Sequence, residues 1–349
     1  MAPLKSSLDP SPIKRLEHLD ALRGLAALWV CLFHFSHGGT IVSDGLICGF
    51  MKIGHHGVDI FFVLSGYLVP HLLWSRGHNL GKLPEFLWRR LARLHPPFMI
   101  ANVLVIALNF ASWLVVGPPV SGAPSWSEVS YSLITDSCYI SGALDRPWIN
   151  VVAWTLAVEV QFYLFSGFLM ALVPLHHPRL FAIILILLTA GSPALVAYSQ
   201  FLQHLPTFVF GWAIAFHQHT SSEDKSSWKS TLLLLLTAAT VNLIEQRWMT
   251  LLFAAATAIC TVLPSIRFPR WLRLAGLISY SLYLVHVPVG GRVINLGGRV
   301  AQGDWQNYML IGLSLIVSIL FATAFWRLVE VPSQRLSRWK RRRPFPAIS

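Results

Sequence analysis

The chain has 349 residues, of which 54% are hydrophobic and 12% charged, and its formal net charge is +12 at pH 7. A typical soluble domain has about 25% charged residues, and a soluble core of this size could not enclose so many apolar side chains, so lipid must cover much of the surface. The positive charge lies between apolar runs, which indicates membrane topology and argues against nucleic acid as a partner.

Ten apolar stretches are long enough to cross a bilayer. They predict an all-α polytopic membrane protein, folded as a single bundle of about ten transmembrane helices. The stretches are 19–37, 57–75, 95–117, 151–174, 180–198, 201–217, 230–246, 249–265, 274–291 and 307–328. The segment before the first stretch is polar and contains proline, and the first stretch itself contains Arg23. We therefore expect the first stretch to be a retained helix and not a cleavable signal.

Lysine and arginine predict which way the bundle faces, because they are enriched in cytoplasmic loops. With a cytoplasmic N-terminus, all but five of the 27 lie on the cytoplasmic side. The exceptions are Lys52, Arg146, Arg247, Arg292 and Arg299. We therefore expect both termini in the cytoplasm, with a tail over 1–18, a transmembrane domain over 19–332 and a basic tail over 333–349. The basic tail is expected to lie near anionic lipid headgroups.

The four cysteines show no spacing typical of a metal site, and we expect no bound metal. Cys48 and Cys138 fall in segments predicted to lie outside, where a disulfide between them is allowed. The longest outer segment, 118–150, contains Trp126 and Trp148, which suit the membrane interface.

Titratable side chains occur inside four different predicted spans. Such groups are costly in hydrocarbon, so they are candidates for function. The four are His34, Asp59, Glu159 and His286. The span boundaries place all of them in the outer half of the bilayer, at similar depth. The alternative is structural, because an intramembrane histidine can bond a neighbouring helix and carboxylates can neutralise nearby positive charges.

Arg23 precedes His34 by eleven residues on the first predicted helix. At 100° per residue the two side chains share one face to within about 20°, about 16 Å apart along the axis. Arg90 and Arg93 lie in the following inner segment, where their spacing can present two guanidiniums to a polyanion. Ordinary enrichment of positive charge in cytoplasmic loops is the alternative explanation for these two arginines.

Six segments form an ordered set of motifs. LDALRGLAALWVCLFHF (19–35) contains an arginine and a histidine separated by ten residues, Arg23 and His34, and RRLARLHP (89–96) contains Arg90 and Arg93. The others are GVDIFFVLSGYLV (57–69), WTLAVEVQFYL (154–164), ISYSLYLVHVP (278–288) and VEVP (329–332). In this order they resemble the motifs of the membrane acyltransferase 3 family. Some members carry an extracellular hydrolase-like domain after the last helix; we see no counterpart, which leaves the acceptor open.

The resemblance implies an O-acyltransferase of the cell membrane. Members of the family move an acyl group, commonly acetyl, from acetyl-CoA or another acyl-CoA to a hydroxyl. The acceptor is a glycan outside the cytoplasmic membrane or a small secreted product. The implied partners are the lipid bilayer, acyl-CoA and the hydroxyl acceptor.

A hypothesis for the site follows from the motifs. Arg90 and Arg93, with help from Arg23, would hold the phosphates of acyl-CoA. His34 would act as general base, with Asp59 or Glu159 orienting its imidazole. His286 completes the set of catalytic candidates.

Other interpretations stay open. In a proton-coupled transporter or flippase the same titratable groups would relay protons. Such proteins often show inverted repeats or paired broken helices, and the sequence shows neither. A purely structural scaffold is a third interpretation. Within the enzyme hypothesis, Tyr280 and Tyr283 are candidate oxyanion donors and Ser65 a candidate acyl carrier.

Overall fold

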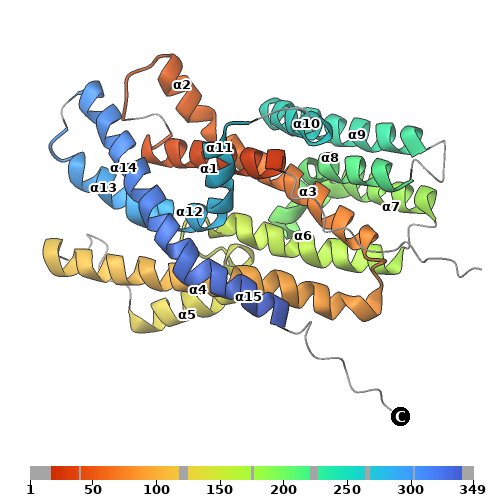
Figure 1. Ribbon diagram of the computed structural model, residues 1–349, viewed down its shortest axis with the longest axis horizontal. Coiled ribbons are helices and arrows are strands. Elements are labelled where there is room, and N and C mark those ends of the chain that lie inside the picture. Colours follow the sequence, from red (N-terminus) through yellow and green to blue (C-terminus); the bar gives the residue numbers. More distant parts are fainter. Residues whose placement is uncertain are drawn as a thin grey trace, which may run out of the picture.

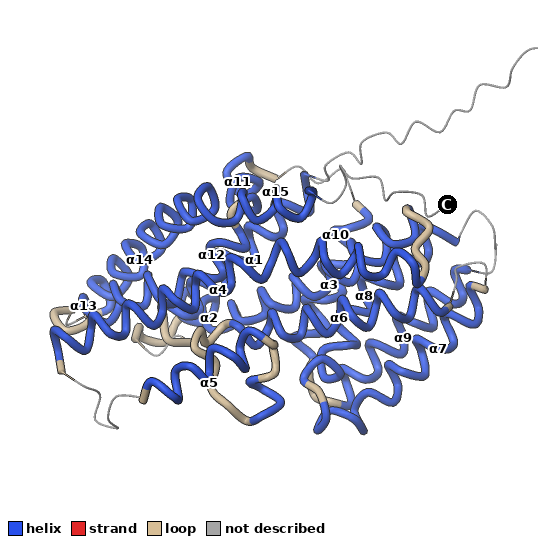
Figure 2. Tube along the Cα trace, turned by 90° about the horizontal axis from the view of Figure 1, so that it is seen from below, coloured by secondary structure: helices blue, strands red, loops and turns tan. Residues whose placement is uncertain are grey.

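The computed structural model describes residues 17–38, 41–117, 125–173, 177–220, 227–263, 268–301 and 303–339. Within these ranges every regular element is a helix, which confirms the all-α expectation (Figure 1, Figure 2). Most of the two predicted tails, residues 1–16 and 340–349, lies outside the described residues.

Six helices in the described ranges are long and apolar enough to cross a membrane. A seventh does so if the bent pair Arg270–Leu277 and Ser279–Gly297 is one span. The six are Leu46–Ser75, Leu80–Val115, Ala153–Leu172, Pro178–Val196, Ser227–Ile244 and Asp304–Leu336. The chain is therefore a multi-pass membrane protein, but the expected ten spans and the cytoplasmic side of both termini are not confirmed.

Three predicted spans coincide with helices outside this set. The helix α1 (Glu17–Phe35) carries ionisable residues at both ends, and α10 (Trp248–Val262) has only 15 residues. The third is α8 (Gln200–Thr220), whose last turn contains two histidines. Polarity and short length thus separate these three helices from the other spans.

The remaining helices complete the bundle. They are α2 (Leu46–Lys52), α3 (Gly57–Ser75), α4 (Leu83–Val116), α5 (Trp126–Ser137), α6 (Ala153–Leu172), α7 (Pro178–Gly191), α9 (Ser227–Ile244), α11 (Arg270–Leu277), α12 (Ser279–Val285), α13 (Gly291–Gly297), α14 (Asp304–Phe325) and α15 (Val331–Trp339). In Figure 1, α7, α8, α9 and α10 gather on one side of the molecule and α5, α13 and α14 on the other, while the long α4 runs across both.

Glycine permits the close packing of α3 against α8. A Cβ atom on Gly66 would overlap the carbonyl oxygen of Phe208, and one on Gly211 would overlap that of Val63. The two backbones can approach this closely only because both helices lack a side chain at the crossing. The contact fixes α3, which carries one wall of the cavity described below.

The segment that carries His286 is broken into pieces. It bends by 63° after α11, and one π-helical turn over His286–Gly290 separates α12 from α13. Asn150 holds α12 in place, because its Nδ2 donates to the carbonyl oxygen of Leu284 at 2.8 Å. The Tyr280 hydroxyl donates to the carbonyl oxygen of Leu94 at 2.7 Å, which ties the same helix to α4. Single π-turns are often found at functional sites.

A second set of hydrogen bonds fixes the first half of α4 and the segment after α5. Ser333 of α15 donates from Oγ to the carbonyl oxygen of Ala92 at 2.6 Å, so α15 lies beside α4 (Figure 1). The fully buried Asp136 of α5 accepts from Ser141 Oγ at 2.5 Å and from the Ile149 amide at 3.1 Å. These hydrogen bonds fix the loop before α6, which carries Asn150 next to α12.

Two of the cysteines bear on the disulfide that the sequence allowed. Cys48 is buried and Cys138 is exposed, and both are free thiols. The disulfide that their predicted positions allowed is not formed.

Candidate active site

His34 and His286 form a dyad. They come from α1 and from the π-turn after α12, 252 residues apart, and His286 Nε2 lies 3.2 Å from His34 Nδ1. The two rings meet edge to face at a centroid distance of 4.9 Å. His286 is fully buried and His34 is half-buried, so only His34 is open to a substrate.

Backbone carbonyls determine where the protons of the neutral dyad lie. His286 Nδ1 is 2.8 Å from the Tyr283 carbonyl oxygen and 3.1 Å from that of Leu282, so this nitrogen must carry a proton and donate. Its Nε2 therefore presents a lone pair to His34. His34 Nδ1 lies 3.0 Å from the Val30 carbonyl oxygen, so it also carries a proton, shared between that oxygen and His286. The remaining nitrogen, His34 Nε2, is left as a proton acceptor.

The pairing corrects the expected role of the carboxylates. Asp59 Oδ2 accepts from His56 Nδ1 at 2.7 Å on the neighbouring turn, and Glu159 bonds Ser65 and Tyr163. Among the described residues, the side chain that contacts the His34 imidazole through a hydrogen bond is therefore His286. The four titratable residues do not form one cluster, although the sequence places them at similar depth.

A pocket opens beside the dyad, which we call the His34 pocket. Its polar lining residues are His34, His37, Asn109, Asn150, Arg292 and Asn295. Apolar residues from α1, α4 and the π-turn complete its wall, and no Asp or Glu is among the described residues that line it.

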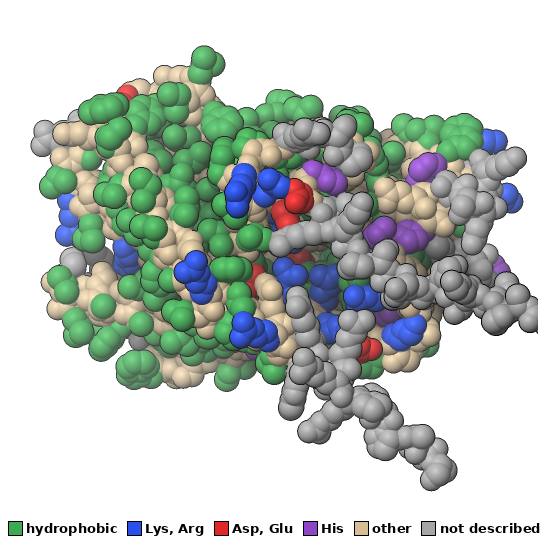
Figure 3. Space-filling view, in the orientation of Figure 1, with side chains coloured by type: hydrophobic (Ala, Val, Ile, Leu, Met, Phe, Trp, Pro, Cys, Tyr) green, Lys and Arg blue, Asp and Glu red, His purple; other side chains and the backbone are tan. Residues whose placement is uncertain are grey.

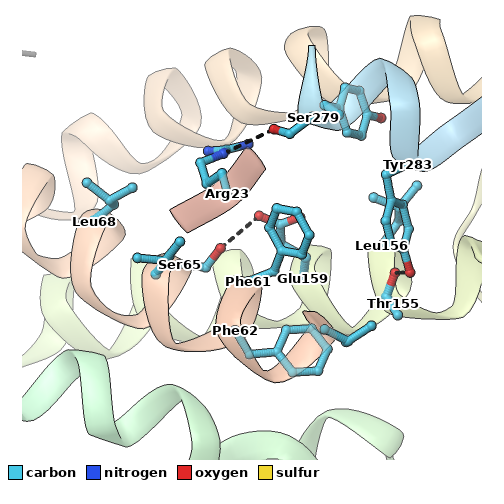
Figure 4. A pocket seen from close by; sticks show the side chains of 13 residues that line it. Arg23, Phe61, Phe62, Ser65, Leu68, Thr155, Leu156, Glu159, Ser279 and Tyr283 are labelled. Atoms are coloured by element: carbon cyan, nitrogen blue, oxygen red, sulfur yellow. Dashed lines mark hydrogen bonds between the residues drawn. The ribbon is translucent and has the colours of Figure 1, made fainter. Parts of the chain in front are cut away.

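A separate cavity, the Arg23 cavity, lies between α1, α3, α6 and α12 (Figure 4). Arg23 Nε donates to Ser279 Oγ at 3.4 Å, and Ser65 Oγ donates to Glu159 at 3.1 Å. The guanidinium also lies 6.0 Å from the centre of the Phe61 ring. Apolar side chains surround these polar groups, and Figure 4 shows Leu68 and Phe62 on the same wall. The cavity combines one cation and one carboxylate with an apolar lining.

Tyr283 stands between the two sites. It lines the Arg23 cavity, and its ring centre lies 5.8 Å from that of His286. Its hydroxyl shares a hydrogen bond of 2.8 Å with Thr155 Oγ1 (Figure 4). A group passing from the Arg23 cavity to His34 would therefore pass Tyr283. Tyr280, the other candidate oxyanion donor, already bonds the Leu94 carbonyl.

Of the three predicted arginines, Arg23 lines the Arg23 cavity together with Glu159. The Arg90 guanidinium lies 5.2 Å from the centre of the Tyr163 ring, whose hydroxyl donates to Glu159. Tyr163 thus links Arg90 to the carboxylate of the Arg23 cavity, and Arg93 follows three residues later on α4.

A basic pocket next to Arg90 was missed by the sequence analysis as a binding site. Its charged and polar lining residues are Arg76, His78, Lys82, Glu85, Arg89 and Arg90. Lys82 is held in place by donating to the carbonyl oxygens of Arg76 and Gly77, both at 2.8 Å. Figure 3 shows Lys and Arg side chains gathered near the middle of the displayed face, with hydrophobic side chains over much of the remainder. The signal in the sequence was the charge of the loop between α3 and α4.

Comparison with known proteins identifies the relatives of this chain. It is 27% identical over 388 residues to the O-acetyltransferase OatA of Staphylococcus aureus, covering 94% of this chain. The chain spans 60% of the length of that relative. BcsY of Komagataeibacter xylinus, whose name describes a membrane-bound transacylase, is 27% identical over 304 residues, with 79% of this chain and 73% of BcsY covered.

A third relative matches over a shorter region. The peptidoglycan O-acetyltransferase OatA of Listeria monocytogenes is 33% identical over 159 residues, 43% of this chain and 23% of the relative. No solved structure matches. The acyltransferase domain of the acyltransferase 3 family matches residues 16–327, nearly the whole chain. The chain therefore belongs to the acyltransferase 3 family, and nearly all of it forms the acyltransferase domain of that family.

Proposed function

We propose that this protein moves an acyl group, in the simplest case acetyl, from cytoplasmic acyl-CoA to a hydroxyl of a glycan on the outer side of the cell membrane. The observation that supports this proposal most strongly is the arrangement of the sites along α1. Arg23 lies in a cavity beside a basic pocket, and His34 lies in a histidine dyad beside a second pocket. One helix therefore connects a site for a polyanionic donor with a site for a hydroxyl acceptor.

The donor would bind from the basic side. The phosphates of CoA carry several negative charges, and the Arg76, Lys82 and Arg90 side chains line a pocket suited to them. From there the pantetheine arm would extend past Arg93 into the Arg23 cavity, whose apolar lining suits the acyl chain. Glu159 accepts from Ser65 and Tyr163, so we assign it a positioning role rather than the role of a base.

The chemistry is proton transfer coupled to acyl transfer. His34 Nε2 takes the proton of the acceptor hydroxyl while the hydroxyl oxygen forms a bond to the thioester carbonyl carbon. The carbon–sulfur bond then breaks, and the proton passes from His34 Nε2 to the CoA sulfur. His286 stabilises the charged intermediate state of His34 by accepting from its Nδ1–H, as a carboxylate does beside other catalytic histidines.

The relatives support a glycan acceptor. One of them is named as a peptidoglycan O-acetyltransferase, and another as an O-acetyltransferase. A small secreted metabolite as acceptor is the alternative within the same chemistry. A transporter would move its substrate without modifying it.

The test is labelled acetyl-CoA with membranes that contain the protein and a polysaccharide acceptor. The wild type should form a base-labile labelled ester, and His34→Ala should reduce the rate by about two to four orders of magnitude. His55→Ala, which changes an exposed histidine near the same end of the bundle, is the matched control and should retain activity. Activity retained by His34→Ala would remove His34 from the mechanism, and unmodified, translocated sugar would favour transport.

A further inference from the structure

The His34 pocket has an asymmetric composition that the transfer chemistry does not require. Three amide side chains and one cation, Arg292, surround the space beside His34. None of the described residues that line it is acidic. Hydroxyl groups alone would be recognised by amides and carbonyls, so the guanidinium calls for a separate explanation.

The partner of Arg292 leaves its charge uncompensated. Its Nη2 donates to Asn109 Oδ1, a neutral amide. Among the described residues no carboxylate forms an ion pair with it, whereas Arg89 pairs with Glu85 and Arg273 with Glu17. A half-buried cation without a counter-ion costs free energy, and an anion that enters the pocket recovers part of that cost.

The amides around Arg292 have capacity left for a ligand. Asn109 uses its oxygen for Arg292, which leaves its two N–H groups available in the described part of the chain. Asn150 Nδ2 donates to the Leu284 carbonyl oxygen and its Oδ1 accepts from the Val152 amide, so this residue contributes to the shape of the pocket wall. Asn295 is exposed at the outer rim. Arg292 and Asn109 can therefore form a bidentate clamp for one oxyanion.

We propose that the acceptor is an anionic sugar, a polyhydroxyl compound that carries a carboxylate. Its anionic group binds Arg292 and Asn109 while one of its hydroxyls reaches His34 Nε2. This inference rests on the proposed function and deepens it. His34 and Arg292 line the same pocket. The anion and the acylated hydroxyl therefore belong to the same sugar unit or to adjacent units.

Equilibrium binding to the purified protein in phosphatidylcholine nanodiscs tests the inference without requiring turnover. The probes are a neutral β-1,4-linked glucose tetramer and its counterpart oxidised to glucuronate. The wild type should bind the glucuronate at least about tenfold more tightly. Arg292→Gln should remove that preference, and Arg292→Lys should keep part of it. Arg299→Gln, which neutralises an exposed arginine that does not line the pocket, should leave it unchanged.

The outcomes separate this inference from the proposed function. Equal affinity of the wild type for both tetramers, or a preference that survives in Arg292→Gln, would overturn the anionic acceptor. Arg292→Lys keeps the comparison valid if the glutamine variant does not fold. Glycerol phosphate, a lipid headgroup without its chains, is the competitor; binding as tight as that of the glucuronate would assign the site to lipid instead. Acetyl transfer to the neutral tetramer with no such preference would keep the enzyme and remove only its anionic acceptor.

Discussion

At the scale of single residues, the main feature is a base supported by a second histidine. The Nδ1–H of His286 is fixed by two backbone carbonyls, so its other nitrogen accepts from His34. A neutral imidazole is a weaker support than a carboxylate, because it adds no negative charge. It also avoids an uncompensated anion in a fully buried position. We infer that His286 is a positioning residue that acts through His34.

The first prediction concerns this pairing. His286→Ala should lower kcat by about two orders of magnitude or more, because His34 loses the group that holds its proton-bearing nitrogen. The KM for acetyl-CoA should change little, since the arginines lie in a different cavity. Steady-state kinetics on purified protein measure both quantities.

A control separates positioning from simple damage to the fold. His286→Gln retains an acceptor and a donor, so it should recover part of the activity and shift the pH profile of kcat relative to the wild type. Equal losses in the alanine and glutamine variants, with KM rising in both, would assign His286 to structure alone.

The sequence could predict the groups at this scale but not their partners. Helical spacing related Arg23 to His34, and the cost of buried titratable groups singled out His286. Contacts between residues 252 positions apart, such as the dyad, depend on tertiary packing that no local pattern encodes. One local signal was available: His56 precedes Asp59 by three residues, a spacing that places both on one helix face. It would have assigned Asp59 to His56 rather than to His34.

At the scale of elements, hydropathy recognises apolar helices and overlooks polar ones. α4 begins at Leu83, although the predicted span began at residue 95, because its arginine-rich first part is helical without being apolar. α5 lies within a predicted loop. A capping box was its signal: Ser125 Oγ accepts from the Glu128 amide at 3.2 Å, and the Ser125 amide donates to Glu128 at 2.7 Å. The hydrogen bonds that the Ser125 amide and hydroxyl donate to the Glu128 carboxylate lower the pKa of that carboxyl.

The second prediction concerns the crossing of α3 and α8. Gly66→Ala or Gly211→Ala should destabilise the protein by about 1–3 kcal/mol, because the new methyl group meets a backbone carbonyl that cannot move aside. Thermal unfolding in detergent should show a lower Tm for each variant. Acyltransfer should fall as well, since α3 carries Ser65 and Phe61 in the cavity wall.

A glycine elsewhere provides the control for that measurement. Gly312 lies in α14, and a Cβ there would meet no atom within 4 Å. Gly312→Ala should leave the Tm unchanged or raise it, because alanine favours helix by up to about 1 kcal/mol. Equal Tm values for Gly66→Ala and Gly312→Ala would show that the crossing tolerates a side chain.

At the scale of the whole molecule, the proposed direction of transfer depends on orientation. The basic pocket and the His34 pocket are lined by different parts of the bundle, with α1 carrying Arg23 near the first and His34 beside the second. Charge distribution predicts that the basic pocket faces the cytoplasm, where acyl-CoA is made. The number of spans stays a prediction too, because α1 and α8 are too polar for apolarity alone to decide how they lie in the bilayer.

The third prediction tests the orientation with introduced thiols in a Cys138→Ser background, which removes the exposed native cysteine. Arg299, after α13, is exposed and lies in a segment predicted to be outside. A membrane-impermeant maleimide should label Arg299→Cys in intact cells stripped of their outer envelope. Arg335→Cys on α15 should react only after the cells are permeabilised.

The reverse pattern would have consequences beyond topology. If position 299 reacted only after permeabilisation and position 335 reacted in intact cells, Arg90 and Arg93 would face away from cytoplasmic acyl-CoA. The histidine dyad would then face the cytoplasm, and an extracytoplasmic glycan could not reach His34. Labelling of both positions in intact cells would instead indicate an even number of crossings between them. Either result would contradict the proposed direction of transfer while leaving the geometry of the dyad unchanged, so the chemistry and the topology can be tested separately.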